Sequence, residues 1–201
     1  MKFKCSYLIL IFFFILSCNN SKEEEIYKIY NTVLQEKVST YGIMVNYFHY
    51  DKDYSEKERE IFAEKIKDSL IKSKSLTYYL DNNLVILDTL NPSDLISTGK
   101  DDNLIFEFKP EYSKNKIDFS KIKKLEIGTR ISEQQEIDEN KKNPTYLGYY
   151  ELSEPIFISK EEAVIKYSHN CGSKCGLVIL IYLKKQEDEW KITNEKLISI
   201  S

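Results

Sequence analysis

The sequence predicts an α+β protein, with two amphipathic helices near the N-terminus and an antiparallel sheet that ends in a C-terminal β-meander. Two observations support this fold class. Apolar residues recur every three or four positions over residues 26–34 and 61–70, the spacing of one helix face. From residue 76 onward, short runs rich in β-branched and aromatic residues alternate with polar turns, a pattern typical of consecutive strands.

The first predicted helix begins at about Glu24 and presents an unbroken apolar stripe. The stripe consists of Ile26, Ile29, Tyr30, Val33 and Leu34. Gly42 ends this periodicity, and residues 43–49 then alternate as in a strand that includes His49. We therefore expect one helix followed by one strand in this part of the chain.

The second predicted helix has a clear start signal. Ser55 and Glu58 form a capping box, in which each side chain accepts a hydrogen bond from the other residue's backbone N–H. We expect this helix to end near Ser73. Its expected core face consists of Ile61, Phe62, Ile66, Ser69 and Leu70.

The middle of the chain carries weaker signals. The segment 81–83 (Asp-Asn-Asn) favours a tight turn between strands at 76–80 and 84–87. A short helical turn after Asn91 and a strand at 104–108 are expected next. Residues 110–145 are the least defined region, with one strand suggested by Leu125, Ile127 and Ile131 and an exposed loop or frayed helix from residue 133 to 143.

The C-terminal part is the best defined by its pattern. Its pattern predicts four strands, at 146–152, 162–170, 176–183 and 190–200, with a tight turn at 186–188. Sequential strands joined by such short turns pair with one another, so we expect an antiparallel meander.

The first residues of the chain have the layout of a secretory signal. Lys2 and Lys4 precede an uncharged apolar run at 7–16, and polar residues follow directly from Asn19. The run is shorter than the ~20 apolar residues that a membrane-spanning helix needs. We therefore expect it to direct export.

The end of this apolar run, Ile15-Leu16-Ser17-Cys18, resembles the lipobox of bacterial lipoproteins. The resemblance implies that the Cys18 thiol receives a diacylglyceryl group and that the chain is cut before Cys18. Two or more acyl chains give stable membrane anchoring. We therefore expect a signal peptide at 1–17, a lipidated tether at 18–25 and a single α+β domain at 26–201, anchored in the cell envelope at the outer membrane.

Removal of the signal peptide changes the charge of the protein. Cleavage would take 17 of the 201 residues, leave 184, and shift the formal charge from −3 to −5, because Lys2 and Lys4 are lost. Nucleic-acid binding needs clustered Lys and Arg, which an acidic chain without a basic patch does not offer. We expect no nucleic-acid partner and no cofactor.

Cys171 and Cys175 are expected to form a disulfide, because an exported protein folds in an oxidising compartment. The intervening residues 172–174 can reverse the chain so that the two cysteines oppose each other across a strand pair. The facing sets are then Ala163, Ile165, Tyr167 and His169 on one strand and Leu177, Ile179, Ile181 and Leu183 on the next.

Two functional interpretations of this cysteine pair compete with the structural one. A redox dithiol usually has two residues between its cysteines and lies at a helix start, whereas here three intervene between strands. A zinc site could use His169, Cys171 and Cys175, but a structural zinc site needs a fourth ligand, and His49 is distant in sequence. We expect no metal site.

The segment from Tyr167 through the CGxxCG hairpin to Trp190 resembles the C-terminal end of a group of small uncharacterised bacterial lipoproteins. That resemblance implies kinship without a known activity. The acidic run at 22–25 similarly resembles the export signal that sends some lipoproteins to the cell surface; an ordinary solvated tether is the alternative.

No sequence motif indicates an enzyme. A G-x-S-x-G elbow is absent, the six glycines form no phosphate-binding loop, and no pair of carboxylates is singled out. Tyr146, Tyr149 and Tyr150 could stack on sugars, although core packing explains them better. We predict a non-catalytic envelope lipoprotein that binds a protein or glycan or fills a structural role. The alternatives are an inhibitor or immunity-type lipoprotein that acts on a basic enzyme and, after it, an unrecognised hydrolase.

Replacing Cys18 with alanine is expected to abolish acylation, because the lipobox implies attachment at this thiol. Metabolic labelling with palmitate and the mass of the N-terminal peptide measure the effect. Cys5→Ser is the matched control, since Cys5 lies in the segment expected to be removed. Labelling that survives in Cys18→Ala, or that disappears in Cys5→Ser, contradicts the assignment.

Overall fold

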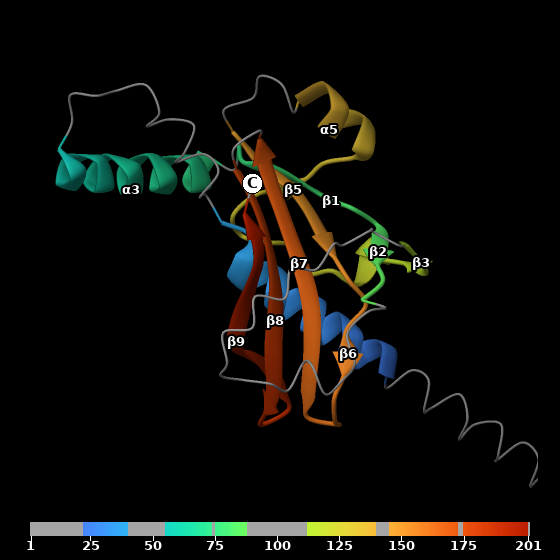
Figure 1. The fold of residues 1–201 in the computed structure, drawn as a ribbon. Helices are drawn as coiled ribbons and strands as arrows, with labels where there is room; N and C mark the ends of the chain where they lie inside the picture. The colour runs from blue at the N-terminus through green and yellow to red at the C-terminus, as the bar shows by residue number, and fades with distance from the viewer. Residues whose placement is uncertain are drawn as a thin grey trace, which may run out of the picture.

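The computed structural model describes residues 22–39, 55–73, 75–87, 112–139, 145–172 and 175–200. A mixed seven-stranded sheet with a few helices dominates this part of the chain, and the sheet ends in the C-terminal meander (Figure 1). The described α-helices are residues 22–37, α3 (Glu56–Ser73) and α5 (Glu133–Glu139), and a short 3₁₀ helix, η1, spans Phe119–Lys121. Within the described residues, none of them is long and apolar enough to cross a bilayer.

The main sheet has the strand order β4-β1-β5-β7-β8-β9, with β6 paired to β7 outside this path. Its strands are β1 (Thr77–Leu80), β4 (Thr129–Arg130), β5 (Tyr146–Leu152), β6 (Ile156–Phe157), β7 (Glu162–Gly172), β8 (Cys175–Gln186) and β9 (Glu189–Ile200). A separate two-stranded sheet joins β2 (Asn83–Val85) to β3 (Tyr112–Lys116).

The predicted C-terminal meander is confirmed. β5, β7, β8 and β9 pair antiparallel in this order. The β8–β9 turn consists of Glu187 and Asp188, which both have positive φ, at 50° and 69°. Two left-handed residues in a two-residue loop match the twist of the strands on either side.

The expectation of a wholly antiparallel sheet is wrong, because β1 runs parallel to both β4 and β5. The expected reversal at 81–83 does not occur. The Asp81 side chain accepts hydrogen bonds from the Asn83 backbone N–H (2.8 Å) and side-chain amide (2.9 Å), and the chain continues into the small sheet. The long connection from residue 81 to 145 then supplies the crossover that a parallel pair requires.

The helix at 22–37 packs its apolar stripe on one face of the main sheet. Ile29, Tyr30, Val33 and Leu34 are at most 1% exposed and share a core cluster with strand residues such as Tyr150 and Ile181. Burying each such side chain contributes about 1.5–3 kcal/mol. The helix begins at Lys22, two residues before the start predicted at about Glu24, and so includes the end of the segment predicted as a tether, residues 18–25.

The capping box of α3 is confirmed, whereas its predicted core face is confirmed only at Leu70, and the side chains of Phe62 and Ile66 lie outside the described ones. The Ser55 N–H donates to Glu58 Oε2 (3.0 Å), and the Glu58 N–H donates to Ser55 Oγ (3.4 Å). However, Ile61 is 49% exposed, and among the described side chains of α3 only Leu70 and Ile71 pack against the core. Figure 1 shows α3 projecting from the sheet, which explains this exposure.

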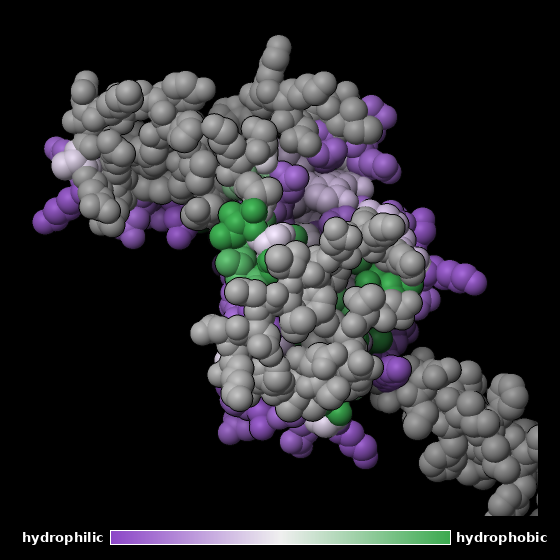
Figure 2. Space-filling view, viewed as in Figure 1, coloured by the Kyte–Doolittle hydropathy of each residue, from purple (hydrophilic) through white to green (hydrophobic). Residues whose placement is uncertain are grey.

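On the face of the molecule that Figure 2 shows, most of the coloured residues at the outline are hydrophilic. The same view shows a hydrophobic patch near the C-terminal end of the chain. Two large apolar side chains close to that end are exposed, Leu197 by 53% and Ile200 by 72%. Both residues belong to β9, the last strand in the order of the main sheet.

The weakly predicted region contains more regular structure than expected. Its single anticipated strand is the two-residue β4, which lies between Leu125 and Ile131, both buried. The segment after residue 133 forms α5, whose start carries a second capping box. There the Ser132 N–H donates to Gln135 Oε1 (3.0 Å) and the Gln135 N–H donates to Ser132 Oγ (3.4 Å).

Several expectations concern residues outside the described part of the chain. These are the signal peptide with Cys5 and Cys18, the strand at 43–49 with His49, the helical turn after Asn91, and the strand at 104–108.

Gly148→Ala is expected to destabilise the fold by more than about 3 kcal/mol, the range of severe packing and backbone defects. Gly148 has φ +126°, and a Cβ there would lie 2.6 Å from both Asn170 O and His169 Nε2. Gly172→Ala is the matched control: its φ is +142°, but a Cβ meets nothing within 4 Å. The Gly172→Ala variant should lose only about 1–2 kcal/mol of stability, from backbone strain at its positive φ. Urea unfolding measures the stability of both variants. Equal losses of stability would contradict the role of the close contacts at position 148 with Asn170 and His169.

Candidate binding groove

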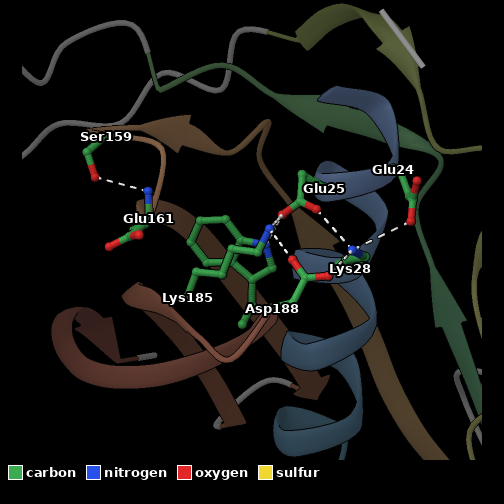
Figure 3. Close-up of polar contacts among 8 residues, drawn as sticks. Glu24, Glu25, Lys28, Ser159, Glu161, Lys185 and Asp188 are labelled. Atoms are coloured by element: carbon green, nitrogen blue, oxygen red, sulfur yellow. Dashed lines mark hydrogen bonds and ion pairs between the residues drawn. The ribbon is translucent and has the colours of Figure 1, made fainter. Parts of the chain in front are cut away.

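Five side chains from two distant parts of the sequence form a polar network where the helix at 22–37 meets the β8–β9 turn (Figure 3). Glu25 is its centre. The Glu25 carboxylate accepts hydrogen bonds from Lys28 Nζ (3.0 Å) and Trp190 Nε1 (2.8 Å), and it pairs with Lys185 Nζ (3.0 Å). Asp188 pairs with Lys185 (2.7 Å) and with Lys28 (3.7 Å), which closes the network.

The protonation of this network follows from its contacts. Burial acts to raise the pKa of Glu25, but the hydrogen bonds from Lys185, Lys28 and Trp190 outweigh it and lower the pKa overall. Hydrogen bonds to Asp188 and Glu25 raise the pKa of Lys185. All charged members are therefore ionised at neutral pH, and the network holds the helix against the hairpin.

A groove of about 520 Å³ runs beside this network. One wall is a polar stripe of the helix with the spacing of a single face, made by Lys28, Asn31, Thr32, Gln35 and Glu36. The other wall consists of residues 188–191 and Lys123. Three cationic and three anionic side chains line the groove, so it is polar without a strong net charge.

Two hydrogen-bonded contacts fix the walls of the groove relative to each other. The Asn31 side chain donates to Lys121 O (3.2 Å) and accepts from the Lys123 N–H (2.7 Å). Thr32 Oγ1 donates to Trp190 O (3.3 Å). Because these hydrogen bonds tie the second wall to the helix that forms the first, the groove is already present in the unbound protein.

Cys171 and Cys175 lie within disulfide distance of each other, with Cα atoms 5.2 Å apart. The predicted register of the flanking strands is confirmed, since Tyr167 faces Ile179 and His169 faces Leu177. Next to the cysteines a bulge shifts the register, so that Cys175 pairs with Gly172 in place of Cys171.

His169 occupies a core position in β7. It is 7% exposed, stacks on Tyr150 with ring centroids 4.4 Å apart, and places Nε2 2.9 Å from Leu147 O. A carbonyl only accepts, so Nε2 carries the proton. Burial lowers the pKa of His169, which keeps the ring neutral at neutral pH. Within the described residues, no three His, Cys, Asp or Glu side chains gather as a metal site.

The tyrosines considered for sugar stacking are packed into the protein. Tyr150 is fully buried, and Tyr146 is 8% exposed. The Tyr149 hydroxyl contacts carboxylate oxygens of Asp81 (2.7 Å) and Glu151 (2.9 Å). Tyr146 and Tyr150 are therefore packed in the protein interior, and the Tyr149 hydroxyl is fixed by the carboxylates of Asp81 and Glu151.

The sequence pattern did not single out the groove. The spacing of Glu24, Glu25 and Lys28 is a readable helical ion-pair signal. Lys185, Asp188 and Trp190 join them only through the tertiary fold, across more than half of the chain. The sequence distinguishes Trp190 only by its place after the cysteine hairpin, and no pattern in it indicates the hydrogen bond to Glu25.

Comparison of the chain with family models, with curated proteins and with solved structures finds no significant match.

Glu25→Gln is expected to lower the free energy of unfolding at pH 7 by about 1–3 kcal/mol, the effect of charge-assisted hydrogen bonds. Because the folded-state pKa lies below the ordinary value of 4.5, the stabilisation is complete above that pH. It is lost as the pH falls through the folded-state pKa. The variant should therefore lose less stability on acidification than the natural chain.

Glu24→Gln is the matched control for this experiment. Its carboxylate is 70% exposed and contacts Lys28 at 3.5 Å, so it should cost no more than about 0.5 kcal/mol. Chemical unfolding at several pH values separates the two variants. Identical pH profiles for Glu25→Gln and the natural chain would contradict the central role of Glu25.

Proposed function

We propose that this protein is a lipid-anchored lipoprotein of the bacterial cell envelope that binds a protein or glycan partner without catalysis, through the groove beside the helix at 22–37. The lipobox-like sequence at 15–18 supports the anchor. The described helix begins at Lys22, so only a few residues would separate the acylated Cys18 from the folded body.

The observation that carries the binding role is the pre-formed groove itself. Its walls come from the helix, the β8–β9 turn and residue 123, and direct hydrogen bonds lock them together. A rigid polar groove loses little conformational entropy when a partner binds. Its mixed charges suit a polar partner such as a protein surface or a glycan.

The environment of the described histidine favours binding over catalysis. His169 stacks on Tyr150 and donates to Leu147 O, so its ring is committed to the core. A general base must reach the proton that it abstracts in a bound substrate. His169 is placed to hold β7 against β5.

A second candidate is an inhibitor or immunity-type lipoprotein that acts on a basic enzyme. The expected charge of −5 for the mature chain favours it. Such a complex would depend on charge attraction, and salt screens exposed charges over about 10 Å at 0.1 M. Loss of the partner as ionic strength rises would support this candidate over the first.

A photo-crosslinking amino acid placed at Gln35 is expected to capture an envelope component in living cells, because Gln35 is exposed and lines the groove. The matched control is the same substitution at Lys72, which is exposed at the end of α3. Immunoblotting and mass spectrometry identify the product. A product from position 35 that is absent from position 72 supports the groove, and equal labelling at both contradicts it.

A further inference from the structure

The pairing of β5 with β7 is the seam between two parts of the main sheet (Figure 1). In the strand order, β4, β1 and β5 lie on one side of this pair, and β7, β8 and β9 lie on the other. The ladder is short, because residues 149–152 of β5 face residues 167–170 of β7. By contrast, residues 162–172 of β7 face residues 175–184 of β8. The seam is therefore the weaker of the two pairings.

His169 lies in this seam, opposite Tyr150 of β5. Its ring stacks on the Tyr150 ring, with centroids 4.4 Å apart and planes inclined by 3°, and its Nε2 donates to Leu147 O (2.9 Å). Both contacts join β7 to β5. The side chain therefore reinforces the backbone hydrogen bonds of the seam.

These contacts suit a neutral imidazole. Because Nε2 carries the proton, Nδ1 keeps a lone pair, and a second proton taken from solvent would bind there and make the ring positively charged. His169 is only 7% exposed, and a buried charge is costly unless an opposite charge pairs with it.

The surroundings of the ring supply no opposite charge. The titratable side chains of the aromatic cluster around it are all tyrosines, namely Tyr78, Tyr150 and Tyr167. Burial raises the pKa of each of these hydroxyls, so none is a phenolate at neutral pH. On β8 the residue opposite His169 is Leu177. The helix at 22–37 contributes Lys37, whose ammonium is paired with Glu195 of β9. Among the described residues, no carboxylate pairs with His169.

We propose that His169 is an acid-sensitive switch in the seam: a proton bound at Nδ1 drives the ring out of its stack on Tyr150 and opens the pairing of β5 with β7, while β7, β8 and β9 stay paired. The switch depends on neither the groove nor the lipid anchor.

The direction of the pH dependence follows from burial. Burial lowers the pKa of His169 below its ordinary value of 6.5, whereas in the open form water reaches the ring and the ordinary value applies. The open form therefore takes up the proton at a higher pH than the closed form. As the pH falls from 7 through 6.5 towards the pKa of the closed form, proton uptake favours opening.

Hydrogen–deuterium exchange of the full-length protein in detergent, at pH 7 and pH 5 and corrected for intrinsic exchange rates, tests the switch. Amides of the seam are expected to lose about 5-fold to 30-fold in protection at pH 5, the upper bound being set by a pKa of 6.5 in the open form alone. Amides of Ile181 and Leu183 in β8 should keep their protection. No loss in the seam, or an equal loss in β8, overturns the proposal.

His169→Gln removes the titrating ring and keeps an amide donor for Leu147 O, so protection of its seam should be the same at both pH values. His49→Gln is the matched control, since the chain has two histidines, and it should respond to acid like the natural chain. An acid response that survives in His169→Gln, or disappears in His49→Gln, overturns the proposal.

An NMR titration keeps the test decisive if His169→Gln fails to fold. The ring Cε1 proton of His169, identified as the histidine signal that remains in His49→Gln, should titrate with a pKa below 6.5. A pKa of 6.5 or above overturns the proposal, because the closed form would then accept the proton without opening.

Discussion

The packing of one helix on one sheet face is the contact on which the rest of the structure depends. The apolar stripe of the helix at 22–37 lies on the strands around Tyr150 and Ile181, and it excludes water from both. Once this contact is made, the polar residues of the helix are fixed in position as well. Thr32 and Lys37 then meet Trp190 and Tyr167, which are more than a hundred residues away in the chain.

The groove beside the Glu25 network and a smaller cleft on the other side of the helix are both consequences of that packing. A helix on a sheet covers only the strands beneath it, and the spaces along its sides are lined by the residues that flank its apolar stripe. On one side the Glu25 network ties the helix to the β8–β9 turn. On the other side the small sheet of β2 and β3 forms the wall. The helix therefore positions side chains for binding at the same time as it closes the core.

Local signals in the sequence predicted the elements whose causes are local. The stripe from Ile26 to Leu34, the capping box at Ser55 and the alternation in the last strands each act within a few residues, and each is present in the structure. The second capping box, at Ser132 and Gln135, has the same kind of signal and could have been found in the same way. The pairing of Tyr167 with Ile179 was predictable because the apolar faces of two consecutive strands fix their register.

The parallel pairing of β1 and the exposure of Ile61 had no local cause. Nothing near residues 77–80 distinguishes an edge of a hairpin from a strand between two parallel neighbours. The sequence by itself determined the helix at 22–37, the start of α3, the strands of the C-terminal meander with their apolar faces, and the position of the lipobox-like segment, because those properties depend on neighbouring residues. Only the tertiary structure decided that Glu25 meets Lys185 and Trp190 and that the Tyr30 hydroxyl is buried without a partner among the described residues. Both depend on how the helix lies on the sheet, and residues distant in sequence determine that placement.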